Sequence, residues 1–196
     1  MKKLLILTFF TILTYFLLVA TYGVFESKVL NGSQIKLAAW KVEVNNTSIT
    51  NEEKTFTIDD IVCSTSDNVL NGKLAPGIEG YFDILVDPKN TEVSVRYDII
   101  YDIDYLQSVN KAFVITKIEE LSGNELVLTD KYTYTGLILL DNNNVHTVRT
   151  YIKWEDVEDN GYNDYVTGTT DTLFELPIKV NVSQYLGEEI IEYNEE

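Results

Sequence analysis

The sequence contains very little cysteine and histidine: among its 196 residues there is one of each, Cys63 and His146. A single cysteine cannot form an internal disulfide, so the fold must be stabilised by core packing alone. A single histidine excludes any site with two imidazole ligands, including the zinc motif H-E-x-x-H. We therefore interpret Cys63 as a small buried residue at a strand end and His146 as a polar surface residue, not as a catalytic pair.

Basic residues are also scarce. The chain has 15 Lys and Arg against 31 Asp and Glu, which gives a formal net charge of -16. Phosphate groups would repel so acidic a protein, which argues against nucleic acid and anionic lipid as partners. The charge suits a soluble, self-repelling exported protein or one that meets cations.

The longest uncharged segment, Leu4 to Phe25, lies near the N-terminus, where two lysines precede an almost unbroken apolar run from Leu4 to Ala20. Basic residues followed by such a run are typical of an export signal or a membrane anchor. In the first interpretation, residues 1–23 are a signal peptide that is cut between Gly23 and Val24. In the second, residues 4–25 remain as a membrane anchor, because a helix rising ~1.5 Å per residue over this length would cross a ~30 Å hydrocarbon core.

The rest of the chain is dominated by short segments in which apolar residues alternate with polar ones. The clearest is Val93–Ile103, where every odd position is apolar or aromatic, a pattern that predicts a half-buried strand. Turn-forming pairs such as Asn71-Gly72 separate the segments, and helix signals are rare. Further strands are predicted over residues 34–44, 56–62, 81–86, 113–118, 145–154 and 178–182.

So many strands in one open sheet would leave an apolar face in water. We therefore expect an all-β fold, a single antiparallel β-sandwich over residues 24–187 that is preceded by an N-terminal hydrophobic helix. Residues 188–196 contain five Glu, and we expect them to form a disordered acidic tail.

Two groups of acidic residues are candidate cation sites. Asp156, Glu158 and Asn160 place side-chain oxygens at alternate positions before Gly161, as at the start of a calcium loop. Position 12 of such a loop is Thr167 instead of the required Glu, so a solvated hairpin loop is the alternative, and no other cofactor is expected. A second group shares one predicted strand face, which we interpret as a solvated outer face: Asp98, Asp102 and Asp104.

Tyrosine is abundant, with 13 copies. A flat ring can stack on a sugar or anchor a protein interface, but it also packs well in a core or across strands. The candidates for a carbohydrate- or protein-binding patch are Tyr132, Tyr134, Tyr151, Tyr162 and Tyr165.

Several motifs, in order along most of the chain, are similar to those of one family. They are L-V-A-T-Y-G-V-F-E-S at 18–27, A-W-K-V-E-V-N at 39–45, L-A-P-G at 74–77 leading into G-Y-F-D-I at 80–84, V-S-V-R-Y at 93–97, P-I-K-V at 177–180 and S-Q-Y-L-G at 183–187. The chain thereby resembles the camelysin/TasA family of exported proteins from Gram-positive bacteria.

This resemblance implies a jelly-roll-like sandwich that is released by a dedicated signal peptidase and located outside the cell or at its surface. The founding members of the family build biofilm fibres, in which the N-terminal segment of one subunit inserts as a strand into the next. In this sequence the donor strand would run from Val24 to about Ile35, with Val24, Phe25, Val29, Leu30 and Ile35 as its apolar residues.

The chain is shorter than the fibre-forming members and has Gly23-Val24 where Ala-Ala is more usual. One histidine supplies no zinc site, so the metalloprotease label of camelysin is not transferred. We expect a non-enzymatic secreted or cell-surface protein, such as a matrix or fibre subunit, that binds copies of itself or other surface proteins. The alternatives are a single-pass, membrane-anchored binding or adhesion module and an extracellular hydrolase, which would need paired carboxylates in a pocket.

Overall fold

The computed structural model describes residues 8–18, 37–49, 54–58, 60–89, 91–169 and 175–194. The chain divides into two compact units, Met1–Leu37 and Ala38–Glu196. In the first unit, residues 8–18 form a helix within the apolar run, as expected. Over the described ranges, no helix combines the length and the apolarity needed to cross a membrane.

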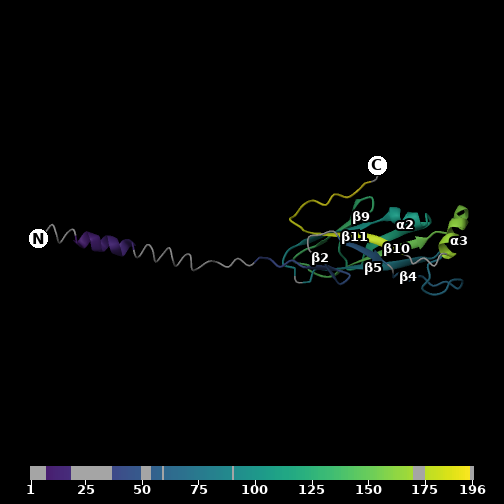
Figure 1. Ribbon diagram of the computed structural model, residues 1–196, viewed down its shortest axis with the longest axis horizontal. Helices are drawn as coiled ribbons and strands as arrows, with labels where there is room; N and C mark the ends of the chain where they lie inside the picture. The colour runs from purple at the N-terminus through teal and green to yellow at the C-terminus, as the bar shows by residue number, and fades with distance from the viewer. Residues whose placement is uncertain are drawn as a thin grey trace. The chain divides into compact units, whose positions relative to one another are not determined.

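The second unit is a sandwich of two sheets in which every strand pairing is antiparallel (Figure 1). This confirms the expected all-β sandwich. The first sheet has the order β2 (Thr47–Ile49), β1 (Val42–Val44), β5 (Glu79–Asp87), β10 (His146–Trp154) and β7 (Phe113–Glu120), and β4 (Val62–Cys63) also pairs with β5. The second sheet has the order β3 (Lys54–Ile58), β11 (Leu176–Gln184), β6 (Val95–Tyr101), β9 (Thr133–Ile138) and β8 (Leu126–Asp130).

Strands β6 and β10 show why this sequence folds into two layers. Their residues alternate strictly between buried and partly exposed positions, which follows from the period of two in a strand. The strand predicted over Val93–Ile103 is therefore confirmed over Val95–Tyr101. It ends at Tyr101, because the next residue, Asp102, accepts the backbone N–H of Tyr105 with its carboxylate at 2.9 Å and caps a following helix.

The buried side chains of β6 meet those of β10 between the sheets. The Tyr97 hydroxyl lies 3.0 Å from Nδ1 of His146, and the Tyr101 hydroxyl lies 2.7 Å from the Thr150 hydroxyl. The interpretation of His146 as a surface residue is wrong: its side chain is fully buried, because it occupies an inward position of β10. Its second ring nitrogen, Nε2, is buried without a hydrogen-bond partner.

Gly136 on β9 makes room for the ring of Tyr97, which is its cross-strand neighbour on β6. A Cβ atom at residue 136 would clash with the Tyr97 ring and hydroxyl. The absence of a side chain on β9 thus positions the hydroxyl that contacts His146 in the other sheet.

Two predicted strands are shorter than expected. In place of one strand over 34–44, residues 37–41 are irregular and a hairpin joins β1 to β2, while residues 34–36 lie outside the described ranges. The two-residue turn of this β1–β2 hairpin is Asn45-Asn46, with positive φ angles of 46° and 62°. Asn tolerates this conformation, which matches the twist of the strands. The strand predicted over 56–62 is also interrupted, since β3 ends at Ile58 and β4 begins at Val62.

The described part of the second unit also contains three short helical segments: α2 (Ile103–Val109), the 3-10 turn η1 (Glu158–Asn160) and α3 (Gly161–Thr169). The alternative interpretation of the segment after Asp156 as a hairpin loop is wrong, because η1 and α3 occupy it. Figure 1 shows α3 at the end of the sandwich opposite β2.

We predict that Gly136→Ala destabilises the sandwich by about 1–3 kcal/mol, because the added methyl group forces the Tyr97 ring away from His146. The measurement is chemical denaturation followed by fluorescence. Gly168→Ala, at a helical position with open space around it, is the matched control and should be neutral or slightly stabilising. Equal losses from the two substitutions would contradict this role of Gly136.

Burial lowers the pKa of His146 below its usual value of 6.5. The unfolded chain therefore takes up a proton at ~pH 6.5 that the folded protein resists, so the free energy of unfolding should fall as the pH drops through this value. His146→Gln does not titrate and should remove this part of the pH dependence. Denaturation between pH 8 and pH 5 measures the free energy of unfolding of the unmodified protein and of the variant. Identical slopes of this free energy against pH would show that His146 is not the cause.

Candidate functional site

The edges of the two sheets are the first candidate for function, because backbone groups on an unpaired edge can hydrogen-bond to another chain. The first sheet ends in β2 and β7, and the second ends in β3 and β8. Most natural edges are protected by shortness, bulges, charges or a covering segment. These four strands differ in that protection.

Strands β2, β7 and β8 each have a recognisable protection. Strand β2 has only three residues. Strand β7 has a bulge at Thr116, where its register with β10 shifts, and the next residue is Lys117, paired with Glu119. Strand β8 is covered by the acidic tail, whose Tyr193 N–H donates to the Leu128 carbonyl at 2.7 Å. The described part of the tail, up to residue 194, contains no helix or strand.

Among the described residues, strand β3 has the least protection, since neither a bulge nor a covering segment lies on it. It has five residues, pairs with β11 without a register shift, and has one charged residue, Lys54, at its start. Within the described part of the chain, β11 is the only strand that pairs with it. It is therefore the best candidate for receiving an added strand.

The hydrogen-bond pattern of β11 with its two neighbours, β3 and β6, shows which backbone groups of β3 face outward. The Pro177 carbonyl of β11 accepts the N–H of Asp102, so residue 177 directs its backbone groups toward β6. Residues 176, 178 and 180 then direct theirs toward β3, where they lie opposite Ile58, Phe56 and Lys54. It follows that the backbone N–H and C=O groups of Thr55 and Thr57 point away from β11, toward the free edge.

A groove lies beside the end of β3. On one edge of β5, β1 pairs with Val86 and Asp87 while β4 pairs with Gly80 and Tyr81, so no described strand pairs with the middle of that edge. The groove has a volume of about 310 Å³, at the bottom of the ~300–1,000 Å³ range of ligand pockets. Its lining includes Asn45, Thr57, Ile58, Val62, Tyr81 and Asp83.

The residues predicted for cleavage and strand donation lie outside the described ranges. These are Gly23 and Val24 at the cleavage position, and Val24, Phe25, Val29, Leu30 and Ile35 in the donor.

A second candidate site is a polar cluster beneath α3. One carboxylate oxygen of Asp164 accepts three hydrogen bonds, from the Trp154 indole N–H at 2.8 Å, the Asn110 amide at 3.0 Å and the Asn160 amide at 2.7 Å. The Asn110 amide also lies 3.1 Å from the Thr167 hydroxyl. These bonds attach α3 to the end of the sandwich, since no residue of α3 is itself buried.

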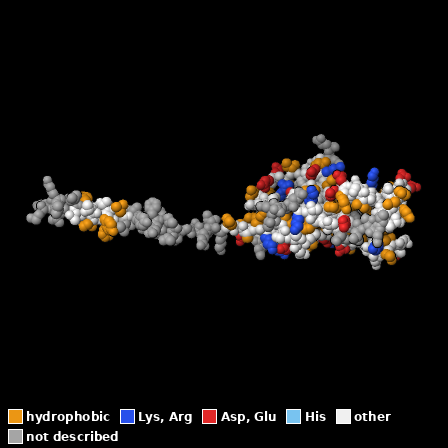
Figure 2. Space-filling model, in the orientation of Figure 1, with side chains coloured by type: hydrophobic (Ala, Val, Ile, Leu, Met, Phe, Trp, Pro, Cys, Tyr) orange, Lys and Arg blue, Asp and Glu red, His pale blue; other side chains and the backbone are white. Residues whose placement is uncertain are grey.

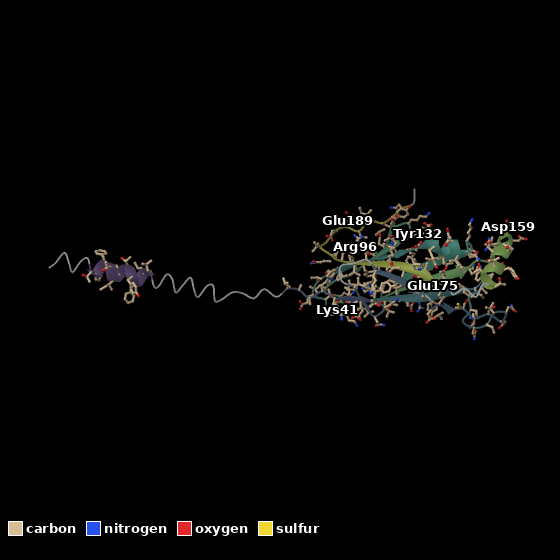
Figure 3. All side chains as sticks on the ribbon, in the orientation of Figure 1. Lys41, Arg96, Tyr132, Asp159, Glu175 and Glu189 are labelled. Atoms are coloured by element: carbon tan, nitrogen blue, oxygen red, sulfur yellow. The ribbon has the colours of Figure 1, made fainter. Side chains whose placement is uncertain are left out.

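The calcium candidates surround this cluster without forming an evident ion site. Asn160 directs its amide nitrogen, a donor, toward Asp164 and Asn110. Asp156 and Glu158 are exposed, and Figure 3 shows the neighbouring Asp159 at the α3 end of the sandwich. The part of the chain that the structure describes contains no group of three or more His, Cys, Asp or Glu side chains that could hold a metal ion.

Cys63 and His146 lie far apart. Cys63 is opposite Gly80 of β5 and His146 is opposite Val86 of the same strand, six positions further on. At ~3.3 Å per residue this separation is roughly 20 Å, too far for a nucleophile and its base. Cys63 does end strand β4, as predicted, but it is only partly buried, and that burial raises the pKa of its thiol.

The acidic group predicted on one strand face is divided between two elements. Asp98 lies on β6, where it accepts hydrogen bonds from Arg96 at 3.0 Å and Thr135 at 2.6 Å. Asp102 caps α2, and Asp104 lies in the first turn of that helix. The prediction of a shared strand face is wrong because the strand ends at Tyr101.

The five candidate tyrosines also separate. Tyr132 and Tyr134 pack against the core, and the Tyr151 hydroxyl donates to Glu119 at 2.8 Å on the first sheet. Tyr162 and Tyr165 are 79% and 67% exposed on α3. Only these two could act together at one exposed surface.

Comparisons with family models, curated proteins and solved structures find no match to this chain. No relative therefore supplies functional residues for comparison, and the candidate sites are identified from the structure of this chain alone. Sequence patterns do not indicate the polar cluster at Asp164, because its hydrogen-bond donors come from residues as far away in the sequence as Asn110. They also do not indicate which of the predicted strands lies at the edge of a sheet.

We predict that Asp164→Ala loosens α3, because the substitution removes the acceptor for Trp154, Asn110 and Asn160. Amide hydrogen exchange should accelerate over residues 161–169, and the free energy of unfolding should fall by about 1–3 kcal/mol. Asp159→Ala, which removes an exposed acid nearby, is the control and should change neither quantity. Unchanged exchange in Asp164→Ala would mean that other contacts hold the helix.

Proposed function

We propose that this protein is a non-enzymatic, secreted or cell-surface β-sandwich that associates with copies of itself by β-strand addition. The observation that supports this most is the free edge of β3, where Thr55 and Thr57 present backbone groups to a neighbour. An extended segment can form hydrogen bonds with such an edge, and its alternate side chains can enter pockets beside it.

The proposed donor is residues 24–35 of a second copy, which begin with Val24-Phe25 and contain few charges. The groove between β3 and β5 is close enough to receive an apolar side chain of an added strand, since Thr57 and Ile58 line it. Burial of such a side chain would add about 1.5–3 kcal/mol to the backbone hydrogen bonds.

The location outside the cytoplasm is part of the proposal. It is supported by Lys2 and Lys3 ahead of the apolar run, and cleavage after Gly23 would free the donor segment. The resemblance to the camelysin/TasA family is consistent with a matrix or fibre subunit. If residues 4–25 instead remain in a membrane, the sandwich would be an anchored binding module.

Cleavage after Gly23 would remove Lys2 and Lys3 and take the net charge from -16 to -18 (-16 minus 2), which limits how copies can meet. Figure 2 shows acidic side chains spread over the visible face of the sandwich, interspersed with basic ones. Face-to-face contact between two such surfaces would be repelled, whereas strand addition uses uncharged backbone groups at an edge. Association should therefore strengthen as salt screens the repulsion.

We predict that deletion of residues 24–35 abolishes oligomers of the exported protein, and that the double substitution Thr55→Pro and Thr57→Pro does the same. Proline removes the outward N–H groups of β3 without touching those bonded to β11. Sedimentation velocity over a range of protein concentrations measures the oligomers.

The matched control is Thr55→Val and Thr57→Val, which keeps both N–H groups and should leave the oligomers unchanged. Circular dichroism establishes that each variant is folded. Oligomers that survive both the deletion and the proline substitutions would reject strand addition at β3.

A further inference from the structure

The outer face of α3 presents two large aromatic side chains to solvent. Tyr162 and Tyr165 are 79% and 67% exposed, and their spacing of three residues places them on one face of the helix. Val166 beside them is 40% exposed, and Val157 in the preceding turn is 43% exposed.

The way α3 is attached explains this exposure. A surface helix usually turns its apolar residues inward, but α3 turns Asp164 and Thr167 toward the sandwich and bonds them to Asn110 and Trp154. Polar contacts therefore hold the helix, and the two tyrosines are not needed for its packing. Exposed rings of this kind are the usual anchors of protein interfaces.

The charge of the segment that carries the tyrosines indicates the kind of partner. Residues 155–169 contain five acidic side chains, Glu155, Asp156, Glu158, Asp159 and Asp164, and no Lys or Arg. Three of these acids, Asp156, Glu158 and Asp159, are exposed in the segment that leads into α3. The same face of a second copy and an anionic lipid surface would both be repelled.

We propose that α3 and the turn before it form a docking surface for a basic polypeptide segment in which Lys or Arg flank an apolar side chain. The apolar side chain packs on Tyr162 and Tyr165, and the cations lie opposite Asp156, Glu158 and Asp159. This partner is distinct from the strand proposed for β3, so the surface can be tested without any oligomer.

The test passes the full chain over three immobilised peptides of equal length, one of Lys and Leu, one of Lys and Ser, and one of Ser and Leu. The Lys/Leu peptide should bind most tightly, and added salt should weaken it. Tyr162→Ser with Tyr165→Ser should lower its affinity roughly tenfold or more. Asp156→Asn, Glu158→Gln and Asp159→Asn together should lower both the affinity and its salt dependence.

Two control variants distinguish binding at this surface from nonspecific binding to exposed apolar side chains. Tyr162→Phe with Tyr165→Phe keeps the rings and should retain binding, and Leu70→Ser removes an apolar side chain that is 80% exposed elsewhere and should have no effect. Absence of Lys/Leu binding, equal binding of the Lys/Ser peptide, or full binding by the Tyr→Ser variant would each overturn the proposal. So would a change in sedimentation of the protein alone in the Tyr→Ser variant, which would make the face a self-contact.

Discussion

The contact between β6 and β10 holds the two sheets of this protein together, in a domain that has no disulfide to assist it. Both strands bury every second residue, and two pairs of polar groups bridge the gap between them, Tyr97 with His146 and Tyr101 with Thr150. Buried polar bonds of this kind fix the relative positions of two layers that apolar contacts alone would leave free to slide. The glycine at position 136 is part of the same arrangement, because it gives the Tyr97 ring its place.

Around this fixed centre, the edges of the two sheets differ in how well they are protected from pairing with another chain. The acidic tail covers β8, and a bulge with charged neighbours protects β7, so both edges resist pairing with another chain. Strand β3 and the outer face of α3 lack comparable cover among the described residues. Both proposed interactions therefore use surfaces that the fold leaves available, one through backbone groups and the other through side chains.

The alternation of apolar and polar residues predicted the sandwich and most of its strands, because one face of each sheet is exposed to solvent and the other is buried. It failed where local chemistry or long-range contacts decide the structure. The Asn45-Asn46 turn divides a predicted strand, and α3 forms from residues with weak helix propensity because Asp164 is bonded to three partners. The free edge of β3 was not predictable, since it depends on residues far away in the sequence. The burial of His146, in contrast, follows from the alternation itself, because His146 lies on the same strand face as Val148, Ile152 and Trp154.

The position of β11 in the second sheet affects how the chain can fold. Strand β3 pairs with β11, and Ile58 lies opposite Leu176, a residue 118 positions later (176 minus 58). Strand β11 also separates β3 from β6, so a growing chain that ends before residue 176 lacks the inner strand that joins the two. Contacts so distant in sequence make folding slow, and the second sheet cannot close until residues 176–184 have been synthesised. Until then β3 lacks the partner strand that the described residues give it, and both of its edges remain open to other chains.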